Sequence, residues 1–391
     1  MMAILLLIII YISYIGLGIP DSLFGAAWPV IYREFNLPVS ASSIVSMLIY
    51  AGTIISSFMG ARMIAKLGTA KVGSLSTILT AVALFAFSKS TGLATFCFWA
   101  IPLGIGAGAI DVAMNNYVAL HYNNMQMNFL HCFYGVGVSL SPYLMSFALS
   151  DNSDWRRGYT TMFILQAVIA LIMTLSIPLW RKVKFDDTTE ETTQKLLSVK
   201  QIVMMPAVRS HVEVMMFSCG IESTCLIWGA TFLADGKGFE PDRAAALVTL
   251  YFVGVTLGRF ASGLLASKLR PDILIYGGQA ITGLAIILMF ITANPYFAVV
   301  GLFTVGFGNG SLFPNMTHLT PLNFGKELSQ SIIGFQMGMC YMAIMLVPPV
   351  FSLIAQFVGA KMFPVYMFIL YLSMMFSTGL LRKRLKHSPT C

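Results

Sequence analysis

Apolar stretches of similar length, separated by short polar segments, repeat along the whole chain. A helix that crosses a bilayer needs about 20 predominantly apolar residues, and twelve stretches reach that length. They lie at approximately residues 3–33, 41–66, 71–89, 93–120, 127–150, 159–180, 208–235, 244–268, 272–292, 295–320, 328–357 and 361–381. The pattern therefore predicts an all-α membrane protein with twelve transmembrane helices.

One polar stretch is longer than the others and divides the predicted helices into two groups of six. It runs from Arg181 to Arg209 and is rich in acidic residues and threonines. We predict an N-terminal six-helix bundle at residues 1–180, a cytoplasmic linker at 181–207 and a C-terminal six-helix bundle at 208–391.

The composition fits a bilayer rather than water as the solvent. Hydrophobic residues make up 57% of the chain and charged residues only 10%, against about 25% charged in an ordinary soluble domain. A soluble fold of this composition would have too little polar surface to cover its core. The chain is therefore expected to be embedded in a lipid bilayer.

The net charge of +8 raises the question of a nucleic-acid partner. With the N-terminus inside, the cytoplasmic loops hold sixteen of the 24 Lys and Arg residues, the outer loops hold seven, and Arg259 lies inside a helix. This bias predicts that both termini are cytoplasmic, and it accounts for the positive charge. No basic stripe interleaved with aromatic residues is present. We expect a multi-pass protein of the plasma (bacterial inner) membrane that binds no nucleic acid.

The sequence lacks the common motifs of catalysis and metal binding. It has no HExxH pair, nucleophile elbow or P-loop, and its six cysteines show neither CxxC nor metal-ligand spacing. The first apolar run is longer than a signal peptide and lacks a basic n-region, so we interpret it as a transmembrane helix. We expect no enzyme, no catalytic residue, and no bound metal or cofactor.

The two halves of the chain are related by a shift of 202 residues. Glycines 104, 106 and 108 recur as glycines 306, 308 and 310, and Gly52 recurs as Gly254. The shift spans six helices, an even number, so the repeats have the same orientation in the membrane. This layout resembles the major facilitator superfamily, which implies two bundles that alternately open a central site to either side.

The loop between the second and third helices departs from the superfamily's pattern, Gly-x-x-x-Asp-Arg-x-Gly. The stretch from Ala61 to Gly68 has Ala65 in the acidic position, and the second copy has Ser267 there. The departure implies that the family's carboxylate latch is absent or rebuilt in this chain.

Four ionisable residues within the predicted helices are our candidates for proton coupling. They are Asp21, Asp111, Glu222 and Arg259. A charge at a helix centre costs about 2.5–3.5 kcal/mol on insertion scales, so such a residue should face a polar cavity or a partner. Each acid could instead serve only as a structural hydrogen-bond partner of a neighbouring helix.

The two N-terminal acids lie on glycine-lined helix faces. Helical spacing places six side chains on one face of the first helix: Tyr14, Gly18, Asp21, Gly25, Trp28 and Tyr32. One face of the fourth helix carries Gly104, Gly108, Asp111 and Asn115. A carboxylate in a poorly solvated cavity is costly to keep ionised, and a reversible proton carrier requires such a group.

Arg259 lies deep in its helix, nine residues before Lys268. That separation is about 13 Å along the helix axis. A carboxylate partner is therefore expected, with Glu222 and Asp21 as the candidates. A static ion pair and a role in the transport cycle both stay open.

Eight polar or aromatic residues are our candidates for solute binding. A buried amide offers both a donor and an acceptor to a hydroxylated solute, and an aromatic ring offers a flat surface. The aromatic rings could equally be packing residues, and a lone histidine could link two helices. The candidates are Trp28, Asn115, Asn128, His131, Trp228, Asn309, Phe335 and Gln336.

Helices 1, 4 and 5 resemble one branch of the superfamily, the fucose–proton symporters and their sodium-dependent glucose-transporter relatives. The branch pairs an acid in helix 1 with an acid in helix 4, where a glycine-rich run precedes a stretch such as Asp111 to Asn115. Its helix 5 pattern fits Asn128, His131, Phe133 and Gly137. The resemblance implies that Asp21 and Asp111 carry the proton and that Asn128 and His131 lie near the sugar.

We therefore expect a monomeric, proton-coupled secondary transporter that takes up a monosaccharide or a similar small polar solute. Na⁺ stays open as the coupling ion. A drug or metabolite efflux antiporter is an alternative, although Ser141 replaces the glycine that precedes the proline in the antiporter motif of helix 5. A solute receptor that keeps the fold without ion flux is a further alternative.

Overall fold

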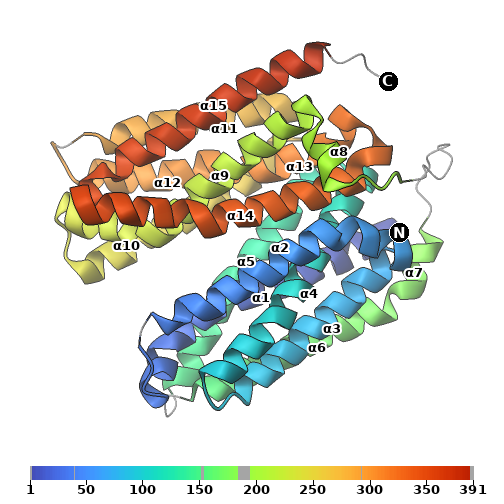
Figure 1. Ribbon diagram of the computed structural model, residues 1–391, viewed down its shortest axis with the longest axis horizontal. Helices are drawn as coiled ribbons and strands as arrows, with labels where there is room; N and C mark the ends of the chain where they lie inside the picture. The colour runs from blue at the N-terminus through green and yellow to red at the C-terminus, as the bar shows by residue number, and fades with distance from the viewer. Residues whose placement is uncertain (1, 39, 151–153, 184–193, 292, 388–391) are drawn as a thin grey trace. The chain divides into compact units, whose positions relative to one another are not determined.

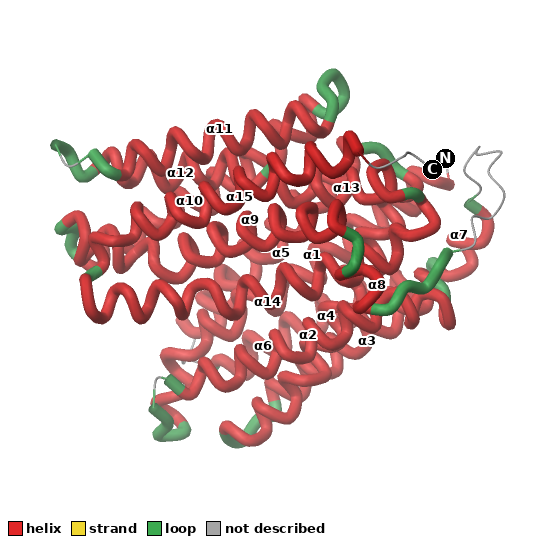
Figure 2. The backbone as a smooth tube through the Cα atoms, turned by 45° about the horizontal axis from the view of Figure 1, so that its top comes forward, coloured by secondary structure: helices red, strands yellow, loops and turns green. Residues whose placement is uncertain are grey.

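The structure, a computed structural model, describes residues 2–38, 40–150, 154–183, 194–291 and 293–387. In these residues all regular secondary structure is helical and there is no strand (Figure 2). The helices labelled in Figure 1, with the short η1 and η2, are α1 (Met2–Glu34), α2 (Ala41–Leu67), α3 (Thr69–Ser88), α4 (Leu93–His121), α5 (Asn124–Ser150), α6 (Trp155–Leu175), α7 (Ile177–Lys182), α8 (Val199–Val203), α9 (Pro206–Thr231), η1 (Phe232–Gly236), α10 (Pro241–Leu265), α11 (Pro271–Met289), α12 (Tyr296–Gly310), α13 (Leu312–Phe324), α14 (Lys326–Val358), η2 (Ala360–Met362) and α15 (Phe363–His387).

Twelve of these helices, some joined to a short neighbour, are long and apolar enough to cross a membrane within the described ranges. The predicted fold class is confirmed, and the helix ends lie within a few residues of the predicted ones. Large apolar side chains stand exposed on them, including Leu175 at 71%, Phe357 at 82% and Phe376 at 69%. Such exposure is unfavourable in water but natural in hydrocarbon. The chain is a multi-pass membrane protein.

Three local features differ from the predicted helices. The sixth span is broken at Ser176 into α6 and α7, because Pro178 lies in the first turn of α7 and cannot donate the hydrogen bond that would continue α6. The tenth span is broken at Ser311, directly after a glycine-rich run, into α12 and α13.

The third difference is α8, a short helix within the predicted linker. Ser198 and Gln201 form a reciprocal capping box at its start, which satisfies two of the free N–H groups of the first turn. Residues 184–193 of the predicted linker lie outside the described residues.

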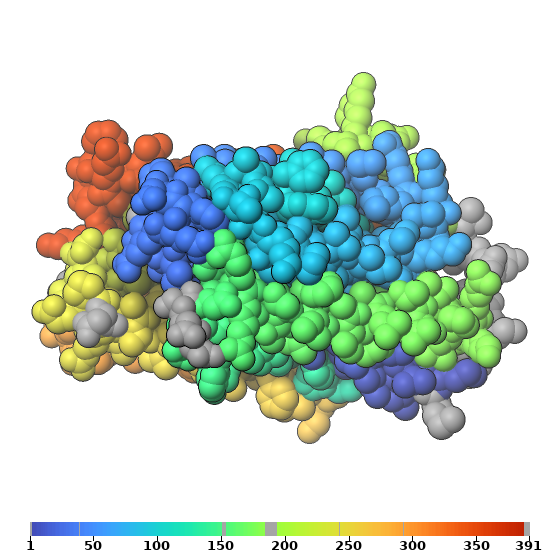
Figure 3. Space-filling view, turned by 90° about the horizontal axis from the view of Figure 1, so that it is seen from below, coloured from blue at the N-terminus to red at the C-terminus, as the bar shows by residue number. Residues whose placement is uncertain are grey.

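The chain forms two compact units. The first comprises Met1–His121, Leu130–Leu196 and Ile333–Gly338, and the second comprises Tyr122–Phe129, Leu197–Ile332 and Met339–Cys391. In the first unit α2 packs on α4, and α3 packs on both α4 and α6; Figure 3 shows α6 running beside α3. In the second unit α10 and α11 both pack on α12, and α15 packs on α9. The predicted bundle limits, 1–180 and 208–391, stay predictions.

The same main-chain contact holds a pair of helices together in each unit. A methyl group on Gly104 of α4 would collide with the carbonyl oxygen of Ile49 on α2. A methyl group on Gly306 of α12 would collide with the carbonyl oxygen of Tyr251 on α10. Both residues of the second pair lie 202 positions after those of the first. The sequence repeat is therefore also a repeat of helix packing, in which small residues allow the backbones to touch.

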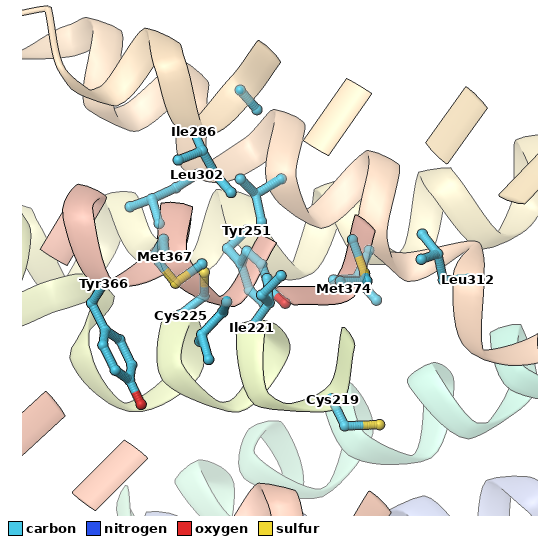
Figure 4. Packing of buried hydrophobic residues seen from close by; sticks show 14 of the residues in the cluster. Cys219, Ile221, Cys225, Tyr251, Ile286, Leu302, Leu312, Tyr366, Met367 and Met374 are labelled. Carbon is cyan, nitrogen blue, oxygen red and sulfur yellow. The ribbon is translucent and has the colours of Figure 1, made fainter. Parts of the chain in front are cut away.

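The core of the second unit is a cluster of buried side chains from α9 to α15, η1 included. Figure 4 shows Cys225, Tyr251 and Met367 packed with Ile286 and Leu302. The five cysteines within the described residues are all free thiols.

Gly18 and Gly25, both on α1, give a matched test of helix packing. A side-chain carbon on Gly18 would meet the main chain of Tyr134 and Val138 on α5, whereas one on Gly25 would meet no atom within 4 Å. Gly18→Ala is expected to lower the free energy of unfolding by about 1–3 kcal/mol through overpacking. Gly25→Ala should leave it unchanged or raise it by up to about 1 kcal/mol, because alanine favours the helix. Unfolding of the two purified variants in detergent measures the difference, and equal stabilities would contradict the close α1–α5 contact.

Candidate functional site

Four buried side chains from α1, α4 and α5 form a hydrogen-bonded group in the first unit, which we name the Asp111 cluster. Its members are Tyr14, Asp111, Asn115 and His131, of which none is more than 5% exposed. The Tyr14 hydroxyl donates to Asp111 Oδ1 at 2.9 Å, and Asn115 Nδ2 donates to the same oxygen at 2.8 Å. The structure thus brings three of the predicted residues together and adds Tyr14 to them.

The hydrogen-bond directions in the Asp111 cluster follow from one main-chain group. Asn115 Nδ2 lies 3.0 Å from the carbonyl oxygen of Asp111, which can only accept, so this end of the amide must be the nitrogen. Asn115 Oδ1 is therefore a hydrogen-bond acceptor. His131 Nε2 lies 3.1 Å from this oxygen and donates a hydrogen bond to it. Asn115 Nδ2 also donates to the Tyr14 hydroxyl at 2.6 Å. The amide hydrogens of Asn115 are fully used inside the protein.

The second acid of the first unit, Asp21, is exposed, and its carboxylate accepts a hydrogen bond from the Tyr134 hydroxyl on α5. Asp21 interacts electrostatically with Asp111 and with Tyr50 of α2. Tyr134 interacts in the same way with Tyr14. The two acids therefore belong to one electrostatic system, although they differ in exposure.

Close contact between α1 and α5 positions these groups. Gly18 lies one turn after Tyr14 and three residues before Asp21, and it packs against the main chain of Tyr134. One residue after Asp21, the Ser22 hydroxyl donates to the carbonyl oxygen of Val138 at 2.5 Å. Main-chain contact of the two helices thus places the tyrosine of α5 at the acid of α1.

Trp28, predicted to share the face of Asp21, lies in a different environment. It is only 5% exposed and packs against Phe24 and Tyr32 at ring-centroid distances of 5.2 and 6.2 Å. Its ring belongs to aromatic packing in this structure, so a solute could reach only a small part of it.

In the second unit, Arg259 of α10 forms an ion pair with Glu222 of α9. Arg259 Nη2 lies 3.2 Å from Glu222 Oε1, and Arg259 Nε donates to the carbonyl oxygen of Gly310 at 3.3 Å. The side chains are 8% and 33% exposed, respectively. Of the two partners considered for Arg259, the structure pairs it with Glu222.

Asn128 belongs to a second polar group, which we name the amide cluster: Asn124, Asn128, Asn315 and Ser262, all in the second unit. Asn124 Nδ2 donates to Asn315 Oδ1 at 2.5 Å, and Asn315 Nδ2 donates to the Ser262 hydroxyl at 2.8 Å. Asn128 Nδ2 donates to the carbonyl oxygen of Asn124 at 2.9 Å. Among the described residues, Asn128 Oδ1 is buried without a hydrogen-bond donor. It is therefore an available acceptor.

The other predicted solute-binding residues are divided between the units. In the second unit, Trp228 Nε1 donates to the carbonyl oxygen of Pro348 at 3.1 Å. Asn309 accepts from the Ser218 hydroxyl and donates to the Ser218 carbonyl oxygen, both at 2.9 Å.

Phe335 and Gln336 of α14 belong to the first unit. Phe335 packs on Phe58 at a centroid distance of 5.7 Å, and Gln336 is fully buried. Phe335 therefore has a packing role in this structure.

The described residues contain no group of three or more His, Cys, Asp and Glu side chains that could hold a metal ion. The ionisable side chains instead pair with phenols, amides and one guanidinium. This arrangement suits proton transfer and charge compensation.

The sequence pattern did not indicate a role for Tyr134 or for the Asn124–Asn315 pair. Tyr134 lies three residues after His131, on the same helix, and that spacing was the available signal. Asn124 lies one turn before Asn128 in the same way. Neither spacing shows which helix carries the hydrogen-bond partner of Tyr134 or of Asn124.

Twelve membrane-spanning helices in two related halves, with the Asp111 carboxylate buried among polar side chains, are typical of a membrane transport protein. The chain belongs to the Major Facilitator Superfamily, whose family model matches residues 10–348 and again residues 212–389. Members of this family are transporters, and the chain is a transporter rather than an enzyme.

Relatives and solved structures match over most of the chain. Bypass of stop codon protein 6 of Saccharomyces cerevisiae is 21% identical over 92% of this chain and 78% of its own length. A putative glucose/galactose transporter of Helicobacter pylori is 23% identical over 81% and 80%. The crystal structure of the transporter FucP in the outward conformation has a TM-score of 0.81, 15% identity and full coverage of both chains. A second structure, of the E. coli fucose:proton symporter FucP, has a TM-score of 0.77, 16% identity and 99% coverage of both. At these identities the solved structures show a shared fold.

Proposed function

We propose that the protein is a proton-coupled symporter that takes up a monosaccharide or a similar small polar solute by alternating access. The observation that carries the proposal is the Asp111 carboxylate, which is 4% exposed and bonded to a phenol and an amide. FucP, which shares the fold, is a fucose:proton symporter, and the H. pylori relative is a putative glucose/galactose transporter. Both descriptions favour a sugar-like cargo.

In this proposal the charge state of Asp111 controls the conformational cycle. A carboxylate anion in a poorly solvated bundle is costly when its surroundings rearrange. Proton binding removes the charge, and the loaded protein can then change conformation. Asp21 serves as the second proton-coupling acid, and the Glu222–Arg259 pair balances charge in the second unit.

Polar side chains of α5 bind the solute in the proposal. Asn128 Oδ1, which has no donor among the described residues, accepts from a solute hydroxyl. The His131 ring, which is bonded to Asn115 of the Asp111 cluster, also contacts the solute in the proposal. Asn115 positions Asp111 and His131 rather than donating to the solute, because its amide hydrogens are already used.

The membrane arrangement of the proposal follows from the basic residues. We infer cytoplasmic termini in the plasma (bacterial inner) membrane from the excess of Lys and Arg on one side of the predicted spans. We further propose that the transporter acts as a monomer.

Purified protein in liposomes tests the proposed function. Addition of monosaccharides, polyols, amino acids or aromatic acids outside sodium-free vesicles should give solute entry with simultaneous alkalinisation of the medium, for a sugar or polyol but not for the other solutes. Protein-free vesicles are the control. Solute entry without pH change, or entry that requires Na⁺, would overturn proton coupling. Transport limited to hydrophobic drugs would favour the antiporter.

A further inference from the structure

We propose that Tyr134 and Tyr14 pass the proton between the exposed Asp21 and the buried Asp111, so that the deep acid is loaded through two phenol hydroxyls. This inference rests on the proposed function and deepens it. It assigns a role to two residues that are neither acids nor solute ligands.

The two acids differ in exposure, and for this reason Asp111 needs a path along which a proton can reach it. Asp21 is exposed, whereas Asp111 is 4% exposed and lies among Tyr14, Asn115 and His131, which are also buried. In the proposal the exposed Asp21 is the entry point for the proton, whereas a group sealed within a bundle requires hydrogen-bonded intermediates. Asp111 therefore needs a chain of exchangeable hydrogens that ends at an accessible group.

Each acid is bonded to one tyrosine, and α1 participates in both pairs. The Tyr134 hydroxyl of α5 donates to Asp21 of α1, and the Tyr14 hydroxyl of α1 donates to Asp111 of α4 at 2.9 Å. The contact at Gly18 lies between Tyr14 and Asp21 along α1 and includes the main chain of Tyr134. The segment of α1 from Tyr14 to Asp21 thus carries one phenol itself and contacts the residue that carries the other.

Titratable side chains of α2, α4 and α5 interact with the acids and phenols of this path. Asp21 interacts with Asp111 and, from α2, with Tyr50, and Tyr14 interacts with Tyr134. His131 meets the ring of Tyr14 edge-on, at a centroid distance of 5.6 Å, and is hydrogen-bonded to Asn115. Each phenol is therefore bonded to one of the two acids, and the step between the phenols is part of the proposal.

The transfer conserves atoms and charge. A proton from the solution binds Asp21, and neutral Asp21 gives it to the Tyr134 oxygen after the Tyr134 hydroxyl has rotated away. The original Tyr134 hydrogen passes to the Tyr14 oxygen, directly or through a water molecule, and the original Tyr14 hydrogen passes to Asp111. Each phenol gains one O–H bond and loses one. The net change is one proton moved from Asp21 to Asp111.

Phenylalanine substitutions test the relay, because they remove only the hydroxyl. Tyr134→Phe and Tyr14→Phe should each slow proton-coupled solute accumulation in liposomes by about 100-fold, while solute exchange under equal concentrations, which needs no net proton movement, stays near the wild-type rate. Tyr143→Phe is the matched control, since Tyr143 lies on α5 and is 62% exposed. Wild-type proton-coupled accumulation in the Tyr14→Phe/Tyr134→Phe double variant would overturn the relay.

A second measurement is independent of transport. After a rapid acidification of the detergent-solubilised protein, the infrared band of protonated Asp111, assigned by its loss in Asp111→Asn, should rise about 100-fold more slowly in Tyr14→Phe than in the wild type. Equal rates would contradict the relay. If a phenylalanine variant does not fold, 3-fluorotyrosine at position 134 or 14, which keeps the hydroxyl as a stronger acid, should shift the pH dependence of the rate, and an unshifted profile would count against the relay.

The outcomes separate the relay from the proposed function. If the wild type moves solute without protons, both are wrong. If the wild type couples protons and the phenylalanine variants couple them equally well, the symporter stands and the relay alone is rejected.

Discussion

Replacing Asp111 with asparagine is expected to abolish proton-driven accumulation of the solute while sparing its exchange. Asparagine has nearly the same size and keeps an oxygen that can accept from Tyr14 and Asn115, but it cannot gain or lose a proton near neutral pH. The rate of accumulation under an inward proton gradient should fall by at least about 100-fold. Uptake of labelled solute into liposomes, with and without the gradient, measures the effect.

Asp154→Asn is the matched control for this prediction. Asp154 caps α6 by accepting from the main-chain N–H of Arg157 at 3.1 Å, and asparagine is an equally good N-cap. The control should therefore accumulate solute like the wild type. Gradient-driven accumulation that persists unchanged in Asp111→Asn, without proton flux, would remove Asp111 from the coupling mechanism.

The second large effect is expected at the Glu222–Arg259 ion pair. Arg259→Gln leaves the carboxylate of Glu222 without its cation in a partly buried site, and it should lower the free energy of unfolding by roughly 3 kcal/mol. The double variant Glu222→Gln/Arg259→Gln has no unpaired charge and should recover most of that loss. Denaturant titration of the purified variants in detergent measures both values.

The pair Arg270–Asp272 supplies the control for the buried ion pair. It has a similar separation, 3.1 Å, but its side chains are 80% and 39% exposed, so Arg270→Gln should cost less than about 1 kcal/mol. If Arg259→Gln and Arg270→Gln lower the free energy of unfolding equally, burial does not increase the cost of removing the cation at Arg259. Full solute uptake by the Glu222→Gln/Arg259→Gln variant would further show that the pair has no part in coupling.

The fold could be predicted from the sequence because a bilayer imposes one simple condition. Each span must be apolar for about 20 residues and helical throughout, so the pattern alone gave twelve helices. The break at Ser311 and the short helix α8 were missed for local reasons. The first depends on how a glycine-rich run is packed, and the second is stabilised by the capping residues Ser198 and Gln201 rather than by an apolar face.

The candidate site was only partly predictable, because the sequence shows which residues are unusual but not what they face. Asp21 and Asp111 stand out as charges within apolar runs, whereas Tyr134 is one of 15 tyrosines and gains its interest only from its bond to Asp21. Trp28 shares a predicted helix face with Asp21, yet neighbouring rings cover it. Helical spacing predicts which side chains share a face of a helix, but tertiary packing decides which groups that face contacts.

The amide cluster has a consequence for the way the start of α5 is held within the second unit. The first residues of α5, up to Phe129, belong to that unit together with Asn315 and Ser262. The bonds from Asn124 to Asn315 and from Asn315 to Ser262 join only neutral groups, and the loop signature that would supply a carboxylate has Ala65 and Ser267 instead. Ionic strength screens charges but not hydrogen bonds between amides, so this attachment should hold equally well in dilute and in saline surroundings.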